Sequence, residues 1–371
     1  MQFIDLKTQQ KRIRQDIEAK ILNVLDHGQY ILGPEISELE NKLASYVDIK
    51  HAIACSSGTD ALLLALMALN IGRGDIVYTT PFTFIATAEV ISLLGATPVF
   101  SDIDPVTYNI DPVSLEKTII SNKSKNLIPK AIIAVDLFGL PADYNALQDI
   151  AKKHNLFLIE DAAQSFGAEY KNKKACSFAD ISATSFFPAK PLGGYGDGGM
   201  VFTNNDDYEN LIRSFYIHGQ GNTKYENIRI GINGRLDTLQ AAVLLCKFDI
   251  FPEEIEMRQI VANRYNEMLK NSNIFTTPSI PENYLSAWAQ YSILCEDETI
   301  RTDKMDKLKN ENIPTAIYYP IPLHLQKAFE NLGYNEGDFP VCESIAKRIF
   351  SLPMHPYLSE HDQKIITDTL L

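Results

Sequence analysis

The chain has 371 residues, 45% hydrophobic and 22% charged, which is typical of a globular protein with one large domain and a smaller one. Its 34 basic and 47 acidic side chains give a net charge of −13, which argues against a surface for nucleic acids or anionic membranes. Since no apolar run approaches the ~20 residues that span a bilayer, and no basic leader precedes one, we expect a cytoplasmic protein. The five scattered cysteines predict reduced thiols rather than disulfides or a zinc site.

Short apolar runs alternate with helical stretches between residues 50 and 205. This alternation is typical of a mostly parallel sheet covered by helices. We predict strands at residues 76–78, 97–100, 131–135, 156–159 and 200–203, and helices at residues 60–70, 83–94 and 143–154. The sequence therefore predicts an α/β fold with a doubly wound sheet.

Helical patterns dominate after residue 205. We predict helices at residues 206–218, 237–251 and 252–271, strands at 288–294 and 315–319, and two closing helices. This organisation predicts a large α/β domain over residues 1–250 and a smaller C-terminal α+β domain over residues 251–371.

The surroundings of one lysine, Lys190, are unusual for a charged side chain. Phe186 and Phe187 precede it, a glycine-dense loop follows it, and the next charged residue along the chain is Asp197. Burial among apolar groups lowers the pKa of a lysine and frees its lone pair for attack on a carbonyl carbon. Most lysines in apolar loops instead extend their amine into water, so other segments must support a chemical role.

The glycines after Lys190 spell G-x-G-x-x-G through Gly194, Gly196 and Gly199. In a dinucleotide-binding loop this pattern follows a strand and opens a helix, whereas here it precedes a predicted strand. The pattern therefore argues against a nicotinamide oxidoreductase. We interpret these glycines as positions where the backbone passes close to a bound group.

Three segments at predicted strand ends converge, because ligands of open α/β sheets bind at the carboxyl ends of the strands. In the first, small residues including Gly58, Thr59 and Asp60 open a very apolar helix. The free backbone amides and the dipole of such a helix end can hold a phosphate without a basic side chain. The plainer interpretation is an ordinary N-cap made by Thr59 or Asp60.

The second segment follows the strand at residues 156–159 and contains Asp161, Ala163 and Gln164. A carboxylate at Asp161 can hold a ring nitrogen protonated, and the small Ala163 lets a flat ring lie against the backbone. The alternative is an aspartate that only caps the next turn. In the third segment, Phe84 can stack on a planar ring or belong to the core. A lysine nucleophile, phosphate cradle, ring-nitrogen carboxylate and stacking aromatic together indicate a pyridoxal 5'-phosphate site.

The chain resembles the DegT/StrS family of sugar aminotransferases almost from end to end. The resemblance lies in the motifs at residues 58–61, 160–164, 185–190, 196–199 and 233–237. It implies the fold type I of pyridoxal phosphate-dependent transferases, as in aspartate aminotransferase. It further implies that Lys190 forms a Schiff base with the cofactor aldehyde, Asp161 binds the pyridine nitrogen, Gln164 lies near the ring hydroxyl and Phe84 stacks on the ring.

The same resemblance implies how the cofactor phosphate is held. The backbone amides of Thr59 and Asp60 and the hydroxyl of Ser185 would bind it, and Asn233 would reach it from the other subunit. An active site shared in this way would make a homodimer necessary for activity.

Within the family, the chain is similar to members that aminate C3 of a nucleotide-linked 3-keto sugar for bacterial O-antigen and lipopolysaccharide biosynthesis. The implied substrates are UDP-2-acetamido-2-deoxy-3-oxo-glucuronate and L-glutamate, which leaves as 2-oxoglutarate. Tyr318 stands before Tyr319 where relatives commonly carry a histidine, and Arg235 is available to bind the sugar carboxylate. A dTDP-linked 3-keto-6-deoxyhexose or a 4-keto sugar nucleotide remains an alternative substrate.

Two other functions of the same fold are alternatives to transamination. A sugar dehydratase carries histidine in place of the anchoring lysine, and Lys190 argues against it. A regulatory protein that binds pyridoxal phosphate without turnover is the second, and no DNA-binding segment is evident in the sequence. We expect His218 and His324 to be ordinary loop histidines.

Overall fold

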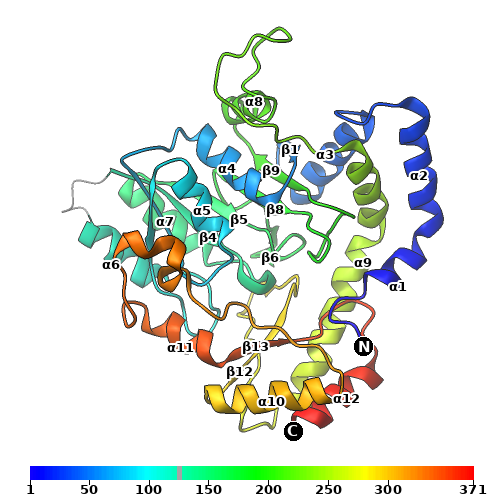
Figure 1. Ribbon diagram of the computed structural model, residues 1–371, viewed down its shortest axis with the longest axis vertical. Helices are drawn as coiled ribbons and strands as arrows, with labels where there is room; N and C mark the ends of the chain where they lie inside the picture. The colour runs from blue at the N-terminus through cyan, green and yellow to red at the C-terminus, as the bar shows by residue number, and fades with distance from the viewer. Residues whose placement is uncertain (123–127) are drawn as a thin grey trace.

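A seven-stranded sheet forms the centre of the computed structural model, which describes residues 1–122 and 128–371 (Figure 1). Its order is β1-β9-β8-β5-β4-β2-β3. The bounds are β1 (His51–Cys55), β2 (Asp75–Thr79), β3 (Thr97–Phe100), β4 (Ile128–Val135), β5 (Phe157–Asp161), β8 (Ile181–Ser185) and β9 (Gly199–Thr203). Strand β9 pairs antiparallel with β1 and β8, whereas the other neighbouring pairs are parallel. The predicted mostly parallel α/β sheet is confirmed.

Helices cover both faces of this sheet. On one face lie α4 (Gly58–Ala68), α5 (Ala86–Leu93) and α8 (Asp206–Phe215), and on the other lie α3 (Pro34–Val47), α6 (Pro112–Asn122) and α7 (Tyr144–His154). Neighbouring residues of a strand enter different cores, as Ile132 and Ile133 of β4 do, because successive side chains point to opposite faces. Both faces are therefore buried, as a parallel sheet requires.

Strands β1 and β8 were not predicted, although both belong to the central sheet. Their sequences, HAIAC and ISATS, contain alanine, serine and cysteine, and few of the branched and aromatic side chains that favour strands. Pairing with β9 decides their conformation, so a tertiary contact outweighs the weak local preference.

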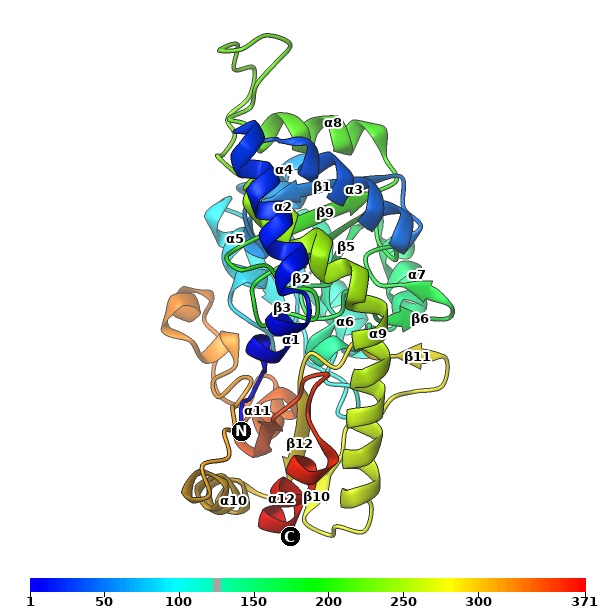
Figure 2. The same ribbon diagram turned by 90° about the vertical axis from the view of Figure 1, so that its right-hand side faces the viewer.

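One long helix, α9 (Thr238–Leu269), replaces the two helices predicted at residues 237–251 and 252–271. Pro252 lies inside it, although a proline there removes one helical hydrogen bond. The helix runs beside α2 (Arg14–His27) and continues down to α12 (Glu360–Leu370), as Figure 2 shows, and these contacts stabilise it through the proline. Since α9 crosses residue 250, the division into two domains at that residue stays a prediction.

The C-terminal part contains a second sheet, of order β10-β12-β13, with β10 (Phe275–Thr276), β12 (Tyr291–Cys295) and β13 (Ile349–Leu352). Helices α10 (Glu298–Asn310) and α11 (Pro340–Arg348) contact β12 of this sheet, and α12 contacts α10. The strand predicted at 288–294 begins only at Tyr291, because Trp288 has a φ of 48°. The prediction of a strand at 315–319 is wrong, because the segment makes only a single bridge, between Ala316 and Ser351. Tyr319 packs instead on the rings of Phe82 and Phe84, which follow β2.

Shorter elements complete the structure. Strands β6 (Glu169–Tyr170), β7 (Lys173–Lys174) and β11 (Tyr284–Leu285) form a third sheet, and 3-10 turns lie at Leu137–Gly139, Leu323–Leu325 and Lys327–Leu332. The N-terminal α1 (Leu6–Arg12) ties the chain start to α9, since Gln9 Nε2 donates to Glu254 Oε2 at 2.8 Å. Within the described residues, no helix is long and apolar enough to cross a bilayer.

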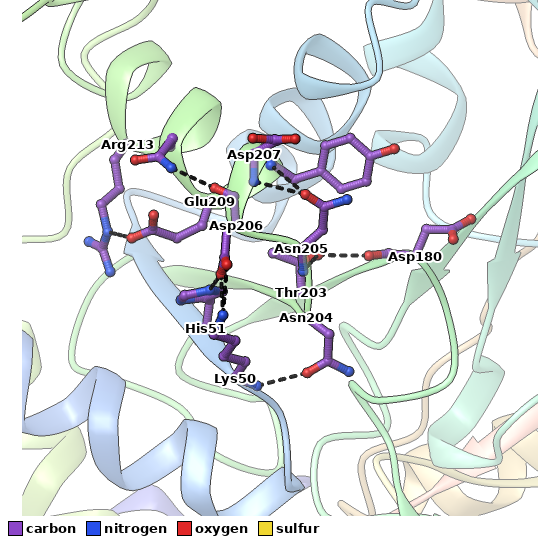
Figure 3. Close-up of polar contacts among 12 residues, drawn as sticks. Lys50, His51, Asp180, Thr203, Asn204, Asn205, Asp206, Asp207, Glu209 and Arg213 are labelled. Carbon is purple, nitrogen blue, oxygen red and sulfur yellow. Dashed lines mark hydrogen bonds and ion pairs between the residues drawn. The ribbon is translucent and has the colours of Figure 1, made fainter.

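A polar cluster fastens α8 to the edge of the sheet (Figure 3). Asp206 at the start of α8 accepts from Lys50 Nζ at 2.8 Å and lies 2.6 Å from His51 Nε2, and Asn205 caps the helix. Two turns further on, Arg213 donates to Glu40 of α3 at 3.0 Å. These contacts hold the base of the segment between α8 and α9, which projects from the body in both views (Figures 1 and 2).

Candidate active site

Asp161 ends β5 at the carboxyl edge of the sheet, where the residue is 5% exposed. Its Oδ2 accepts from the hydroxyl of Thr87 at 2.8 Å, and its Oδ1 accepts from the amide of Ala163 at 3.2 Å. Burial raises the pKa of Asp161, whereas these two donors and the charge of Lys190 oppose the rise. Thr87 was not predicted; its position in the first turn of a largely apolar helix, α5, was the available signal.

Lys190 lies close enough to Asp161 for the two charges to interact. Burial lowers the pKa of the Lys190 amine, and the Asp161 carboxylate partly offsets that effect. The structure therefore brings together the amine and the carboxylate that the sequence placed 29 residues apart, at positions 161 and 190. A desolvated amine beside one buried carboxylate is suited to carbonyl chemistry.

Gln164 connects this pair to the C-terminal part of the chain. Its Oε1 accepts from the amide of Phe138 at 2.8 Å, and its Nε2 donates to the Tyr319 hydroxyl at 3.3 Å. Burial raises the pKa of Tyr319, and the charge of Asp161 adds to the rise. The ring of Phe84 lies 6.5 Å from that of Tyr319 and is 55% exposed, so its face is available to a ligand.

The start of α4 lies directly against the end of β8. A Cβ added at Gly58 would come within 2.7 Å of Ser185 Cβ, and one at Gly199 would lie 2.3 Å from the carbonyl oxygen of Ser57. Gly199 thus lets two backbone segments approach closely, and the interpretation that these glycines pass close to a bound group stays a prediction. This packing brings the helix start and the Ser185 hydroxyl into one small cradle.

The N-cap of α4 is Ser57 rather than Thr59 or Asp60, because the Ser57 hydroxyl accepts from the Asp60 amide at 3.0 Å. That amide is therefore already engaged. The amides of Gly58 and Thr59 have no hydrogen-bond partner within the part of the chain that the structure describes. A phosphate role for Asp60 stays a prediction.

Asn233 and Arg235 lie at the base of the projecting segment. Arg235 Nε donates to Asn233 Oδ1 at 3.0 Å, and the carbonyl of Gly234 accepts from the Ser56 amide at 2.9 Å. Tyr318 contacts Tyr319, with ring centroids 5.8 Å apart. His324 is buried and lies 3.0 Å from Glu343.

Two further buried carboxyl groups, which lie close together, are on the opposite face of the sheet from Asp161. Glu160 and Asp136 are both fully buried; Asp136 accepts from Ser165 and Tyr144, and Glu160 accepts from Ser182 and two backbone amides. Burial raises the pKa of Glu160 to about 7 and that of Asp136 well above its usual value, with the charge of Glu160 adding to the latter. The pair therefore keeps a proton that an unfolded chain would release.

We expect the protein to lose stability as the pH rises through about 7. Between the usual Glu160 pKa of 4.5 and its folded value of about 7, the native state binds more protons than the unfolded state. The free energy of unfolding then falls with rising pH, by at most about 1.4 kcal/mol per pH unit for one proton. Urea unfolding across this pH range measures the slope, which Glu160→Gln should flatten; an unchanged slope in the variant would contradict this origin.

An amine of lowered pKa, a buried carboxylate and a backbone cradle thus lie at the carboxyl edge of a seven-stranded α/β sheet, an arrangement suited to a transferase that works through a lysine. Comparison with known proteins is consistent with this class: the sequence model of the DegT/DnrJ/EryC1/StrS aminotransferase family matches residues 11–371. The chain belongs to this family and is an aminotransferase, and the fold type I expected from the sequence is confirmed.

Similar proteins cover the whole chain. "UDP-2-acetamido-2-deoxy-3-oxo-D-glucuronate aminotransferase" of Pseudomonas aeruginosa is 50% identical over 100% of this chain and 99% of that protein. The crystal structure of a DegT DnrJ EryC1 StrS aminotransferase from Brucella abortus is 51% identical, with a TM-score of 0.96 over 100% of this chain and 98% of that chain. The crystal structure of NtdA from Bacillus subtilis with bound cofactor PMP is 29% identical, with a TM-score of 0.90 over 99% of this chain and 82% of that chain.

Proposed function

We propose that this enzyme uses pyridoxal 5'-phosphate to move the amino group of L-glutamate to C3 of UDP-2-acetamido-2-deoxy-3-oxo-glucuronate, for a bacterial surface polysaccharide such as O-antigen. The observation that carries the proposal is Lys190, an amine of lowered pKa that interacts with the buried Asp161. The name of the Pseudomonas relative supports the substrate, and the PMP bound to the Bacillus structure supports the cofactor.

The residues present fit this cofactor. The buried Asp161 carboxylate has no cation within ion-pair distance among residues 1–122 and 128–371, so a protonated ring nitrogen would supply the missing positive charge. The amides of Gly58 and Thr59 with the Ser185 hydroxyl would hold the phosphate, and Phe84 would stack on the ring. When bound, the cofactor supplies an aldehyde carbon for the amino group and a ring that withdraws electrons from the reacting carbon.

The protein's own residues then perform the proton transfers. Lys190 Nζ, whose pKa burial lowers, would hold the cofactor through its aldehyde carbon when no substrate is bound. Once the amino group of glutamate had taken its place, the freed Lys190 amine would take the proton from Cα of glutamate. Water would then release 2-oxoglutarate, and the amino group would stay with the cofactor. In the second half of the cycle Lys190 delivers a proton to C3 of the sugar. The Asp161 carboxylate would keep the ring nitrogen protonated, and Gln164 and Tyr319, which are hydrogen-bonded to each other, would orient the ring.

Product analysis tests this function. The holoenzyme, given L-glutamate, should release 2-oxoglutarate and, with the 3-keto glucuronate nucleotide, form the 3-amino sugar, detected by its mass. Faster amination of a dTDP-linked or 4-keto sugar would contradict the proposed substrate. Cofactor binding without 2-oxoglutarate release would favour a regulatory protein instead.

Arg235, Tyr318 and Tyr319 are the residues we assign to the sugar. Arg235 has a guanidinium able to bind a carboxylate through two hydrogen bonds, and in this chain it donates to a neutral group, the side-chain amide oxygen of Asn233. Preference for the glucuronate nucleotide over a matched sugar without the carboxylate should therefore depend on Arg235.

Replacing Gly58 by alanine should weaken cofactor binding roughly tenfold, equivalent to about 1.4 kcal/mol. The new Cβ would lie 2.7 Å from Ser185 Cβ and would push apart the two sides of the phosphate cradle. Gly72→Ala is the matched control, because its Cβ would meet only Leu94 O at 3.9 Å. Titration of both apoproteins with pyridoxal 5'-phosphate measures the effect; equal affinities would argue against the cradle.

A homodimer with shared active sites is part of the proposal. The projecting segment exposes large apolar side chains, with Tyr225 85% and Ile230 91% accessible, which a partner subunit would cover. Asn233 lies at the base of this segment and is proposed to reach the partner's phosphate.

Changing both Tyr225 and Ile230 to glutamate should give an inactive monomer, because charged side chains oppose burial at the interface. The matched control places glutamate at Val113 and Ile120 of α6, which are 60% and 56% exposed on another surface. Sedimentation measures the mass of each variant. A stable, active dimer after the first pair of changes would contradict this interface.

A further inference from the structure

The loop of residues 186–198, which contains Lys190, is held closed by hydrogen bonds between its own backbone groups. The Phe186 amide donates to Gly198 O and the Gly194 amide donates to Phe186 O, both at 2.7 Å. Gly193 packs directly on the segment leading to Lys190, since an added Cβ would lie 2.5 Å from Pro188 O. A shift of this loop, residues 186–198, would therefore displace Lys190.

Two side chains of helix α9, those of Lys247 and Gln240, bind this loop. Lys247 Nζ donates to Gly193 O at 2.6 Å and lies 4.6 Å from the centre of the Tyr195 ring. Gln240 Oε1, two turns earlier on α9, accepts from the Tyr195 amide at 2.8 Å. Because α9 packs along α2 and α3, both attachments join the loop to a well-supported helix.

The position of Lys247 is costly for a charged side chain. The residue is 1% exposed, and no carboxylate lies within ion-pair distance of it in the described part of the chain. Burial lowers the pKa of its amine to about 8, and the charge of Glu254 only partly offsets this. A buried ammonium without an ionic partner costs free energy that an apolar side chain would not, so packing alone does not account for a lysine here.

We propose that Lys247, together with Gln240, is a positioning residue that fixes the 186–198 loop and thereby keeps the Lys190 amine beside Asp161. Neither side chain touches the reacting atoms, and both act through the loop. The inference rests on the proposed function in taking Lys190 as the lysine that binds the cofactor.

Two measurements on the apoprotein of Lys247→Met test it. The first is reductive methylation of Lys190 by formaldehyde across a pH series, followed by peptide mass spectrometry, which gives the pH midpoint of amine reactivity without any cofactor. The second is the rate at which pyridoxal 5'-phosphate becomes attached to Lys190, trapped by borohydride. A displaced Lys190 should gain water, so we expect its midpoint to rise by roughly one pH unit and its attachment rate to fall roughly tenfold.

Arg258→Met is the matched control, because Arg258 is also a buried cation of α9. It is 4% exposed and donates to Trp288 O at 2.8 Å, away from the loop. This variant should keep the Lys190 midpoint and attachment rate of the wild type, even if its thermal stability falls.

Gln240→Met removes the second attachment of the loop, the hydrogen bond to the Tyr195 amide. This variant tests the positioning of Lys190 if Lys247→Met does not fold. It should shift both readouts in the same direction as Lys247→Met. Wild-type values in the folded variants would overturn the inference. If the wild-type protein attaches no pyridoxal 5'-phosphate, the proposed function fails, whereas the formaldehyde midpoints still report on the positioning of Lys190.

Discussion

Lys190→Ala should reduce transamination by at least about a thousandfold, because the variant loses both the nucleophile and the group that moves protons. The wild-type protein with pyridoxal 5'-phosphate should show an absorbance band near ~420 nm that L-glutamate bleaches. In the variant this lysine-dependent band should be absent. Steady-state rates and spectra of the two proteins measure the effect.

Lys190→Arg separates charge from reactivity. Arginine keeps a positive charge near Asp161 but stays protonated, so it has no lone pair for the carbonyl carbon. It should be as inactive as the alanine variant. Substantial activity in either variant, or a glutamate-sensitive band in Lys190→Ala, would show that another group performs the chemistry.

Asp161→Asn should lower kcat by about 10²- to 10³-fold, the range seen when one preorganised electrostatic contact is removed. The amide keeps the size of the side chain and can still accept from Thr87, but it has no charge to hold a ring nitrogen protonated. Loss of that charge should also lower the pKa of Lys190 further, since Asp161 at present raises it. Rates at saturating cofactor and the pH dependence of the lysine-linked band report these two effects.

The neighbouring carboxylate provides a control for Asp161. Glu160 is equally buried, but its partners, Ser182 and the amides of Cys176 and Phe178, lie on the other face of the sheet. Glu160→Gln should therefore change stability and its pH dependence while leaving kcat within a few-fold of the wild type. A large loss of kcat in this variant, comparable to that of Asp161→Asn, would mean that charge near β5 in general, rather than Asp161 in particular, supports the reaction.

Local pattern was sufficient for the α/β class and for the candidates Lys190 and Asp161. An apolar run followed by a polar residue marks the end of a strand, and the carboxyl ends of parallel strands meet at one edge. The glycine-dense loop was also interpretable locally, because the strand that follows it excludes a dinucleotide-binding turn. Short-range spacing carries such information, since strand and helix periodicities repeat within a few residues.

The family motifs added the roles that local pattern left open. The interpretations of residues 58–60 as a cradle or a cap, and of Phe84 as a stacking or a core residue, could not be separated by spacing. The structure shows Ser57 as the cap and leaves Phe84 exposed beside Tyr319.

Tertiary structure alone decided the contacts between distant parts of the chain. Gln164 and Tyr319 are 155 residues apart and meet through one hydrogen bond, and Gly193 and Lys247 are 54 residues apart. Likewise, packing keeps α9 continuous through Pro252, and the 315–319 segment is no strand because Tyr319 packs on Phe82 and Phe84. No periodicity encodes these pairs. The sequence by itself determined the α/β class and the edge of the sheet where the candidate site lies. Pairing and packing between elements decided that β1 and β8 are strands and what supports Lys190 and Asp161, because weak local preferences yield to tertiary contacts.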